Sequence, residues 1–164
     1  GAPLPLGDLT KTFDLVTAFD VLFHLVEDQN WNGALDNIAA AVKSGGYVII
    51  FDKYQSVENA IGHVRRRTLA AYSEALTARG FEVLDVRPIF FLMNSPTDLT
   101  GWNKLLFKLS WSLVKLPYKL GRHMGLGEIL GGMMGAALYL PELWLSRIFS
   151  TGPSTKLLIA RKIK

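Results

Sequence analysis

The sequence predicts an α/β fold built on a parallel sheet, and three segments support this prediction. Residues 13–20 and 47–52 are short apolar runs rich in β-branched and aromatic residues, which is typical of strands buried on both faces. Between them, apolar residues recur at intervals of four, three and four and so share one helix face: Trp31, Leu35, Ile38 and Val42. A strand, a helix and a second strand in this order predict one right-handed βαβ unit.

Capping residues set the expected bounds of this first helix. Asn30 is suited to the N-cap, because its side chain can accept a hydrogen bond from an unpaired backbone amide. Gly45 and Gly46 are suited to end the helix, because glycine enters the left-handed conformation without steric cost. We therefore expect the helix to lie between Asn30 and this glycine pair.

A second helix follows. Thr68 is a suitable N-cap for a helix that runs to about Arg79, and Gly80 is suited to the turn after it. The inner face of this helix is apolar and consists of Leu69, Tyr72 and Leu76.

Two more strands complete the regular part of the chain. Residues 81–94 alternate in polarity and then become continuously apolar, which predicts a strand. Pro88 removes one amide donor from this strand and indicates a bulge or an edge position. Residues 155–163 predict the last strand.

Residues 97–150 do not follow this alternation. They predict two or three helical stretches, which are broken by Pro117, Gly121, Gly125, Gly127 and Pro141. In the first stretch, lysines recur at spacings of four, seven and four and so lie on one face: Lys104, Lys108, Lys115 and Lys119. Leucines and two tryptophans occupy the rest, which makes this a basic amphipathic helix.

The later apolar run, residues 129–141, has 13 residues without a charge. Because about 20 are needed to span a bilayer, we do not expect a transmembrane helix there. Three interpretations of residues 97–150 remain open. They could form a lid over an apolar substrate, a plain packing or dimer surface, or a surface that contacts an anionic membrane.

Composition excludes several classes of protein. The 164 residues are 49% hydrophobic and include no cysteine, which excludes a disulfide scaffold, a thiolate metal site and a cysteine nucleophile. Absence of cysteine is also compatible with a reducing compartment, and we expect a cytoplasmic location. The net charge of +4 is uneven: residues 1–94 hold 8 basic and 11 acidic side chains, and residues 95–164 hold 10 and 3. No nucleic-acid-binding motif accompanies the basic part, so we expect no nucleic-acid partner.

Two segments resemble a known family. FDLVTAFDVLFHL (13–25) and VKSGGYVIIFD (42–52) are similar to the fourth and fifth strands, and their flanking turns, of class I S-adenosylmethionine-dependent methyltransferases. Residues 63–88 resemble the region up to and through the sixth strand of that family, and residues 155–162 resemble its seventh. Ser44 stands where proline is usual in the family.

This resemblance implies a Rossmann-like methyltransferase sheet, represented by its C-terminal strands, with a helical insertion before the last strand. The glycine-rich GxGxG turn of the family does not occur in the matching order. We therefore expect residues 1–164 to form a single partial methyltransferase domain with residues 97–150 as an insertion. The resemblance, together with the lack of a suitable crossover helix, also predicts that strand 155–163 runs antiparallel beside strand 81–94.

The resemblance further implies S-adenosylmethionine as cofactor. Asp8, followed by Leu9, matches the acidic position that accepts a hydrogen bond from the adenine amino group. Phe19, Asp20 and Val21 follow the first strand, at the sheet edge where such folds bind ligands, and would line the methionine part of the cofactor. For both aspartates an ordinary turn or capping role stays open.

Three residues are candidates for contact with the methyl acceptor. His24 lies in the loop after the first strand and could take a proton from a hydroxyl or amine, or could only pack that loop. Arg66 belongs to a run of three arginines before a helix start, where the helix dipole disfavours positive charge. That conflict suggests a substrate carboxylate or phosphate, with a solvated turn as the alternative. Trp102 would contact substrate from the insertion, and no metal site is indicated.

We therefore expect methyl transfer to a small, apolar molecule by an enzyme of which this chain is a part, the chain alone being inactive. The alternative is a non-catalytic interaction module, or a peripheral membrane-binding module, without the cofactor half. An uncovered sheet edge could also pair with another chain, so we expect an oligomer.

Overall fold

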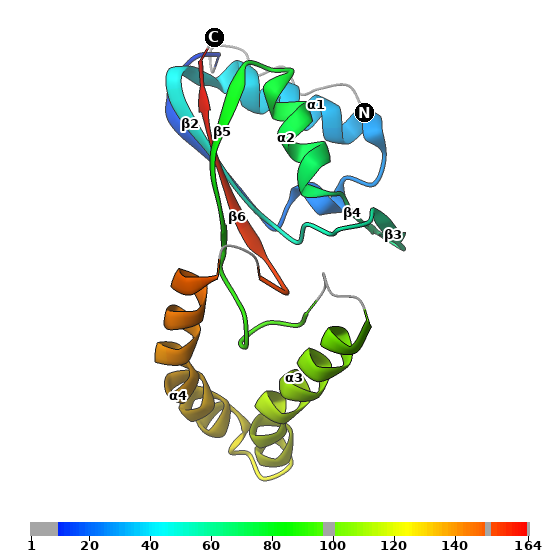
Figure 1. Cartoon of the computed structure of the whole chain (residues 1–164), viewed down its shortest axis with the longest axis vertical. Helices are drawn as coiled ribbons and strands as arrows, with labels where there is room; N and C mark the ends of the chain where they lie inside the picture. Colours follow the sequence, from blue (N-terminus) through cyan, green and yellow to red (C-terminus); the bar gives the residue numbers. More distant parts are fainter. Residues whose placement is uncertain (1–9, 97–100, 150–151, 164) are drawn as a thin grey trace. The chain divides into compact units, whose positions relative to one another are not determined.

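The structure, a computed structural model, describes residues 10–96, 101–149 and 152–163, without the side chains of residues 101–104 and 106 (Figure 1). The described residues divide into two compact units. One unit holds the residues before Arg87 together with those from Lys156 onward, and the other is Arg87–Thr155.

A four-stranded sheet forms the frame of the first unit. Its order is β1 (Phe13–Phe19), β2 (Val42–Asp52), β6 (Lys156–Lys162) and β5 (Phe81–Pro88). β1 and β2 are parallel neighbours, and β2 pairs antiparallel with β6. The predicted parallel βαβ pairing and the partial Rossmann-like sheet are thus confirmed.

The last strand also runs antiparallel to β5. The Ile163 amide donates to the Gly80 carbonyl (2.8 Å), just before β5 begins, and the Ile89 amide donates to the Thr155 carbonyl (3.0 Å), just after β5 ends. Because the start of one strand lies at the end of the other, the two chain directions are opposite. Pro88 is the last residue of β5, an edge strand of this sheet, as the missing amide donor predicts. The prediction that this strand continues to residue 94 was wrong, because the amides of residues 91–93 donate to the Glu142 carboxylate and not to a neighbouring strand.

Two helices, α1 (Asp28–Ala41) and α2 (Leu69–Thr77), lie on the same face of the sheet (Figure 1). Their apolar faces and the inward side chains of the strands form one core, in which the largest fully buried side chains include Tyr54, Tyr72, Phe81, Leu35 and Ile50. The helical periodicity around Trp31 and Leu35, both buried in α1, is therefore confirmed.

The ends of α2 match the prediction more closely than those of α1. The Thr68 hydroxyl accepts a hydrogen bond from the Ala71 amide (3.0 Å), and Gly80 has a φ of 80°. The prediction of Asn30 as the N-cap of α1 was wrong. The helix begins at Asp28, with Glu27 as an N-cap that makes no side-chain capping bond, because buried arginine contacts described below fix this turn.

The glycine pair also has a different role from the one predicted. α1 ends at Ala41 and β2 begins directly at Val42, so Gly45 and Gly46 do not end the helix. Instead they lie in an irregularity of β2: Val42 pairs with Phe13 but Tyr47 already pairs with Leu15, so extra residues bulge from β2. Gly45 has a φ of 80°, and a Cβ on Gly46 would lie 3.0 Å from the Asp14 carbonyl.

No described helix of this unit covers the opposite face of the sheet (Figure 1). Apolar side chains on this face are exposed. Leu15 and Phe19 on β1 are 49% and 55% exposed, and Tyr47 on β2 and Leu84 on β5 are exposed as well. Both faces of such a sheet are usually covered by helices. β1 is also an edge strand of the sheet that the described residues form.

The second unit contains two long helices, α3 (Gly101–Arg122) and α4 (Gly127–Ile148). The prediction that Pro117 and Pro141 interrupt the helices was wrong, since each lies inside one. A proline removes one helical hydrogen bond, and packing beside it can offset that loss. The next residue, Tyr118, lies against α4 at Gly131, and Glu142 binds backbone amides of residues 91–93.

Substitution of Gly46 by alanine should test the bulge in β2. The new Cβ would lie 2.9 Å from Val42 Cγ1 and 3.0 Å from two carbonyl oxygens, so we expect the free energy of unfolding to fall by about 1–3 kcal/mol. Urea denaturation measures this. Ser44→Ala, at an exposed position of the same bulge, should change it by less than about 0.5 kcal/mol. Equal stability of the Gly46→Ala variant and the parent would contradict this packing.

Candidate functional site

A tight turn follows β1 at the carboxyl edge of the sheet. The Asp20 amide donates to the Phe51 carbonyl (2.9 Å), which extends the pairing of β1 and β2 by one residue. Asp20 itself has a φ of 51°, a left-handed conformation that aspartate tolerates better than most residues. The chain therefore reverses here and enters a short 3-10 helix, η2 (Leu22–His24).

This turn presents three neighbouring side chains to solvent. Phe19 and Val21 are 55% and 53% exposed, and Asp20 is exposed between them. Phe19 packs edge-on against Phe51 of β2, with ring centroids 5.9 Å apart. A carboxylate between two apolar side chains can bind a molecule that has an amino group and an apolar part.

His24 is held by two other rings. Its centroid lies 4.1 Å from that of Phe23 and 5.7 Å from that of His63, and the two imidazoles are nearly parallel, at 6°. His63 belongs to the turn of a hairpin formed by β3 (Asn59–Ile61) and β4 (Val64–Arg66). His24 is exposed, so its ring is both oriented and accessible to solvent.

Buried arginine contacts fix the loop that bears His24. Arg67 is 2% exposed, and its guanidinium donates to the Leu25 carbonyl (2.9 Å), the Val26 carbonyl (3.2 Å) and the Asp28 carboxylate (3.0 Å). It also lies over the ring of Trp31, 4.5 Å from the centroid. The hydrogen bond from Arg67 and the nearby Arg65 lower the pKa of Asp28. Arg67 is thus a structural residue.

The arginine run does not form a solvated turn. Arg65 donates to the Val26 carbonyl (3.0 Å) and makes ion pairs with Asp28 and Glu58, and Arg66 is half-buried on β4. The Nε atom of Arg66 is buried and has no hydrogen-bond partner among the described residues. A role for Arg66 in binding an anionic substrate group stays a prediction.

A buried carboxylate lies at the end of β2. Asp52 is 1% exposed and accepts hydrogen bonds from the Tyr72 hydroxyl (2.6 Å) and the Lys53 amide (2.7 Å). Burial raises its pKa, and the two hydrogen bonds oppose this only in part. Burial and the Asp52 charge raise the pKa of Tyr72 in turn. This pair connects the end of β2 to the middle of α2.

The structure places some of the predicted site residues together. Phe19, Asp20 and Val21 are consecutive exposed residues, and the exposed His24 lies three residues further on, at the end of η2. Asp8 and Leu9 lie outside the described residues, as does the side chain of Trp102. Where the structure describes the chain, no group of three histidine or acidic side chains could hold a metal ion.

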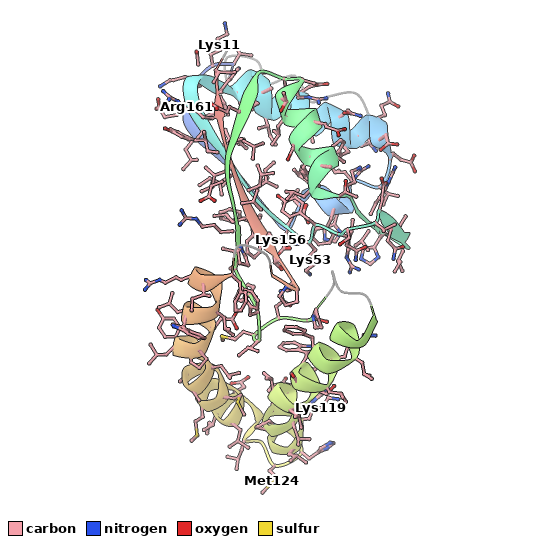
Figure 2. All side chains as sticks on the ribbon, viewed as in Figure 1. Lys11, Lys53, Lys119, Met124, Lys156 and Arg161 are labelled. Carbon is pink, nitrogen blue, oxygen red and sulfur yellow. The ribbon has the colours of Figure 1, made fainter. Side chains whose placement is uncertain are left out.

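Sequence reasoning did not identify Asp52, Tyr72 and His63 as parts of this region. The sequence contained an indication of Asp52, because both predicted strands end in an aspartate. The carboxyl ends of parallel strands meet at one edge of a sheet, where ligands bind. Lys53, labelled in Figure 2, follows Asp52. Its ammonium lies over the Phe23 ring, 5.3 Å from the centroid. His63 had no such signal, since only the hairpin brings it to His24.

Comparison with known proteins finds a family model that matches part of the chain. Residues 2–50, which include β1, η2, α1 and most of β2, match the family model described as "Methyltransferase domain". No curated protein sequence matches the chain.

Solved methyltransferase structures share its fold at low sequence identity. Phosphoethanolamine N-methyltransferase 2 of Haemonchus contortus, in complex with phosphomonomethylethanolamine and S-adenosylhomocysteine, has a TM-score of 0.52 at 15% identity, covering 94% of this chain and 35% of that one. A putative sarcosine dimethylglycine methyltransferase of Galdieria sulphuraria has a TM-score of 0.51 at 13% identity, covering 100% of this chain and 58% of that one.

These similarities confirm the resemblance to class I S-adenosylmethionine-dependent methyltransferases, in the fold and in the residues that the family model matches. The chain spans only about half the length of the solved structures that it matches, between 35% and 58% for these two.

Removing the Tyr72 hydroxyl should show how strongly it stabilises the sheet unit. In Tyr72→Phe, the buried Asp52 carboxylate loses one of the two hydrogen bonds described above, so we expect the free energy of unfolding to fall by about 1–3 kcal/mol in urea denaturation at neutral pH. Tyr47→Phe, at an exposed tyrosine of the same unit, should change it by less than about 0.5 kcal/mol. Similar losses in both variants would contradict a specific role for the bond.

The raised pKa of Asp52 predicts a pH dependence of stability. The folded chain binds the proton of the Asp52 carboxyl more tightly than the unfolded chain does. The stability that this proton contributes is therefore fully present below the ordinary aspartate pKa of 3.8, and it is lost as pH rises through the raised pKa. Relative to Asp52→Asn, the parent should therefore lose stability with rising pH, by at most about 1.4 kcal/mol per pH unit. Urea denaturation across this range measures the difference, with Asp14→Asn as the matched control. A difference that grows in favour of the parent would show that Asp52 prefers to be ionised.

Proposed function

We propose that this chain forms the C-terminal part of a methyltransferase domain that transfers a methyl group from S-adenosylmethionine to a small, apolar acceptor. The observation that carries the proposal is the exposed turn Phe19–Val21 at the carboxyl edge of two parallel strands, within the residues that the methyltransferase model matches. Ligands bind at this edge in open α/β sheets.

The residues of the turn fit the methionine part of the cofactor. The Asp20 carboxylate can accept hydrogen bonds from an amino group, and the exposed Phe19 and Val21 offer apolar contact to the carbon chain beside it. Asp8 would bind the adenine amino group, as the resemblance implies. The cofactor supplies the methyl group on a sulfonium that is already a good leaving group.

The part played by this chain is alignment and proton removal. Phe19 and Phe51 would form an apolar wall that excludes water from the acceptor. His24 would accept the proton from an acceptor hydroxyl or amine, and the stack with His63 would keep its ring in position. Arg66 would contact the remainder of the acceptor.

The uncovered sheet face supports the idea that further protein completes this domain. Exposed apolar side chains on three strands, among them Leu15, Tyr47 and Leu84, are the surface that helices cover in such folds. The same face and the β1 edge also favour a second candidate, a non-catalytic module that binds another chain through this sheet.

Cofactor binding separates the two candidates. In two-dimensional NMR of residues 1–164, S-adenosylhomocysteine should shift the amides of Phe19, Asp20 and Val21 with a dissociation constant weaker than about 1 mM. The reason is that one hydrogen bond contributes about 0.5–1.5 kcal/mol, and this chain can make few hydrogen bonds to the cofactor. These must offset the translational and rotational freedom that is lost on binding. Amide chemical shifts that stay unchanged at every accessible concentration of S-adenosylhomocysteine would support the non-catalytic module.

A longer protein that also carries the glycine-rich turn should bind in the micromolar range. In that protein Asp8→Ala should weaken binding by about tenfold, since a factor of ten corresponds to one such bond to a charged acceptor. Asp14→Ala, at an exposed aspartate paired with Lys43, is the matched control and should leave binding unchanged. Micromolar binding by residues 1–164 alone would show that the pocket is assembled differently.

A further inference from the structure

The helices of the second unit pack closely against one another along one side each. A Cβ on Gly121 of α3 would lie 2.7 Å from Leu130 Cδ1 of α4, and a Cβ on Gly131 would lie 3.3 Å from the Tyr118 ring. The side of each helix that faces the other is therefore occupied by protein.

α3 exposes a leucine stripe on another side. Five leucines recur at spacings of four, four, three and four, and at 100° per residue they fall on one helix face. Each is between 45% and 66% exposed, and we call them the α3 leucine stripe: Leu105, Leu109, Leu113, Leu116 and Leu120. So many exposed leucines on one face indicate an interaction surface.

α4 exposes an apolar stripe of its own. Its members share one helix face and are between 54% and 69% exposed: Ile129, Met133, Leu140, Trp144 and Ile148. Met124, in the turn that joins the two helices, is 73% exposed (Figure 2). The apolar surface thus continues from one helix through the turn to the other.

Basic side chains lie along α3 beside the leucine stripe. Lys108, Lys115 and Lys119 recur at spacings of seven and four, next to the leucines on the helix surface. The sequence Gly101–Arg122 contains no acidic residue, and Arg122 is exposed at its end. A second copy of the chain would bring the same positive face to the interface, so the charge favours an anionic partner.

We propose that the α3–α4 pair binds the surface of an anionic phospholipid bilayer. The α3 leucine stripe and the α4 stripe would enter the boundary between headgroups and acyl chains, and the lysines would contact lipid phosphates. Trp144 suits this depth, because tryptophan is enriched where one end of a side chain is apolar and the other is wet.

α4 is long and apolar enough to cross a membrane, by length and composition only, so the expectation that no transmembrane helix lies there stays a prediction. Two contacts favour binding at the surface over spanning. The Glu142 carboxylate, 6% exposed, accepts hydrogen bonds from the amides of Phe91, Leu92 and Met93, and Gly131 packs on Tyr118. α4 is therefore bound to protein on one side and cannot be surrounded by lipid.

Vesicle flotation of the full chain tests the proposal. The chain should float with vesicles of phosphatidylglycerol and phosphatidylcholine, bind at least about tenfold more weakly to phosphatidylcholine alone, and be released by high sodium chloride. Binding to both kinds of vesicle alike would overturn the proposal, as would failure to float with either. Retention at high salt would indicate a spanning helix and would overturn the surface mode.

Two sets of variants separate the apolar and the charged contributions. Each should weaken flotation with the anionic vesicles by at least about tenfold. The first set replaces three leucines and the second three lysines, all by glutamine, which preserves helix propensity: Leu109→Gln with Leu113→Gln and Leu116→Gln, and Lys108→Gln with Lys115→Gln and Lys119→Gln.

Matched controls lie in the sheet unit, where leucines of similar exposure and the same number of lysines are available. They should bind within about twofold of the parent, since neither set touches α3: Leu15→Gln with Leu84→Gln, and Lys11→Gln with Lys43→Gln and Lys53→Gln.

Two further measurements keep the result decisive. Circular dichroism must show unchanged helix content, and if the leucine set loses helix, the lysine set decides alone. Parent-like flotation of the lysine set would then overturn the proposal. Sedimentation without lipid should show that the leucine set does not alter the oligomeric state. A dimer that the leucine set dissociates, and that vesicles do not displace, would assign the stripe to a second copy.

Discussion

The candidate site depends on one buried guanidinium. Arg67 binds two carbonyls of the loop after η2, the carboxylate at the start of α1 and the ring of Trp31. Without it, the Leu25 carbonyl would lose the hydrogen bond described above and the Val26 carbonyl would keep only that from Arg65, and an unpaired acceptor is costly inside a protein. The same residue comes directly before the Thr68 cap, so it ties α2 to α1 and to the loop that carries His24.

The two units present surfaces of different chemistry. In the sheet unit, exposed side chains at the carboxyl edge combine a carboxylate, an imidazole and aromatic rings, which suits recognition of a small polar molecule. In the helical unit the exposed side chains along α3 include leucines and lysines, which suits binding to an extended, negatively charged surface. The proposed methyl transfer to an apolar acceptor and the proposed binding to a lipid surface are compatible, since apolar molecules partition from water into lipid.

Local sequence signals predicted the elements but not the contacts between them. The four strands of the sheet, the parallel pairing of β1 and β2, the Thr68 cap and the antiparallel last strand followed from periodicity, capping chemistry or family resemblance. The early end of β5 at Pro88 and the β3–β4 hairpin were not predicted. Asn30 was misassigned because Arg67 stabilises an earlier helix start from 39 residues away, a distance along the chain that capping rules do not include. Likewise Pro117 was expected to end a helix, whereas contacts of Tyr118 with the neighbouring helix maintain it.

The central position of β6 has a consequence for the order in which the protein folds. β6 lies between β2 and β5, and Lys162 donates to the Val42 carbonyl 120 residues earlier. During synthesis, the ribosome therefore releases β2 and β5 long before the strand that joins them. Until β6 is available, β2 and β5 each lack a hydrogen-bonded neighbour on the side that β6 later occupies. Contacts between residues far apart in the chain also slow folding. The nascent chain passes through an interval in which these unpaired strands need protection from aggregation.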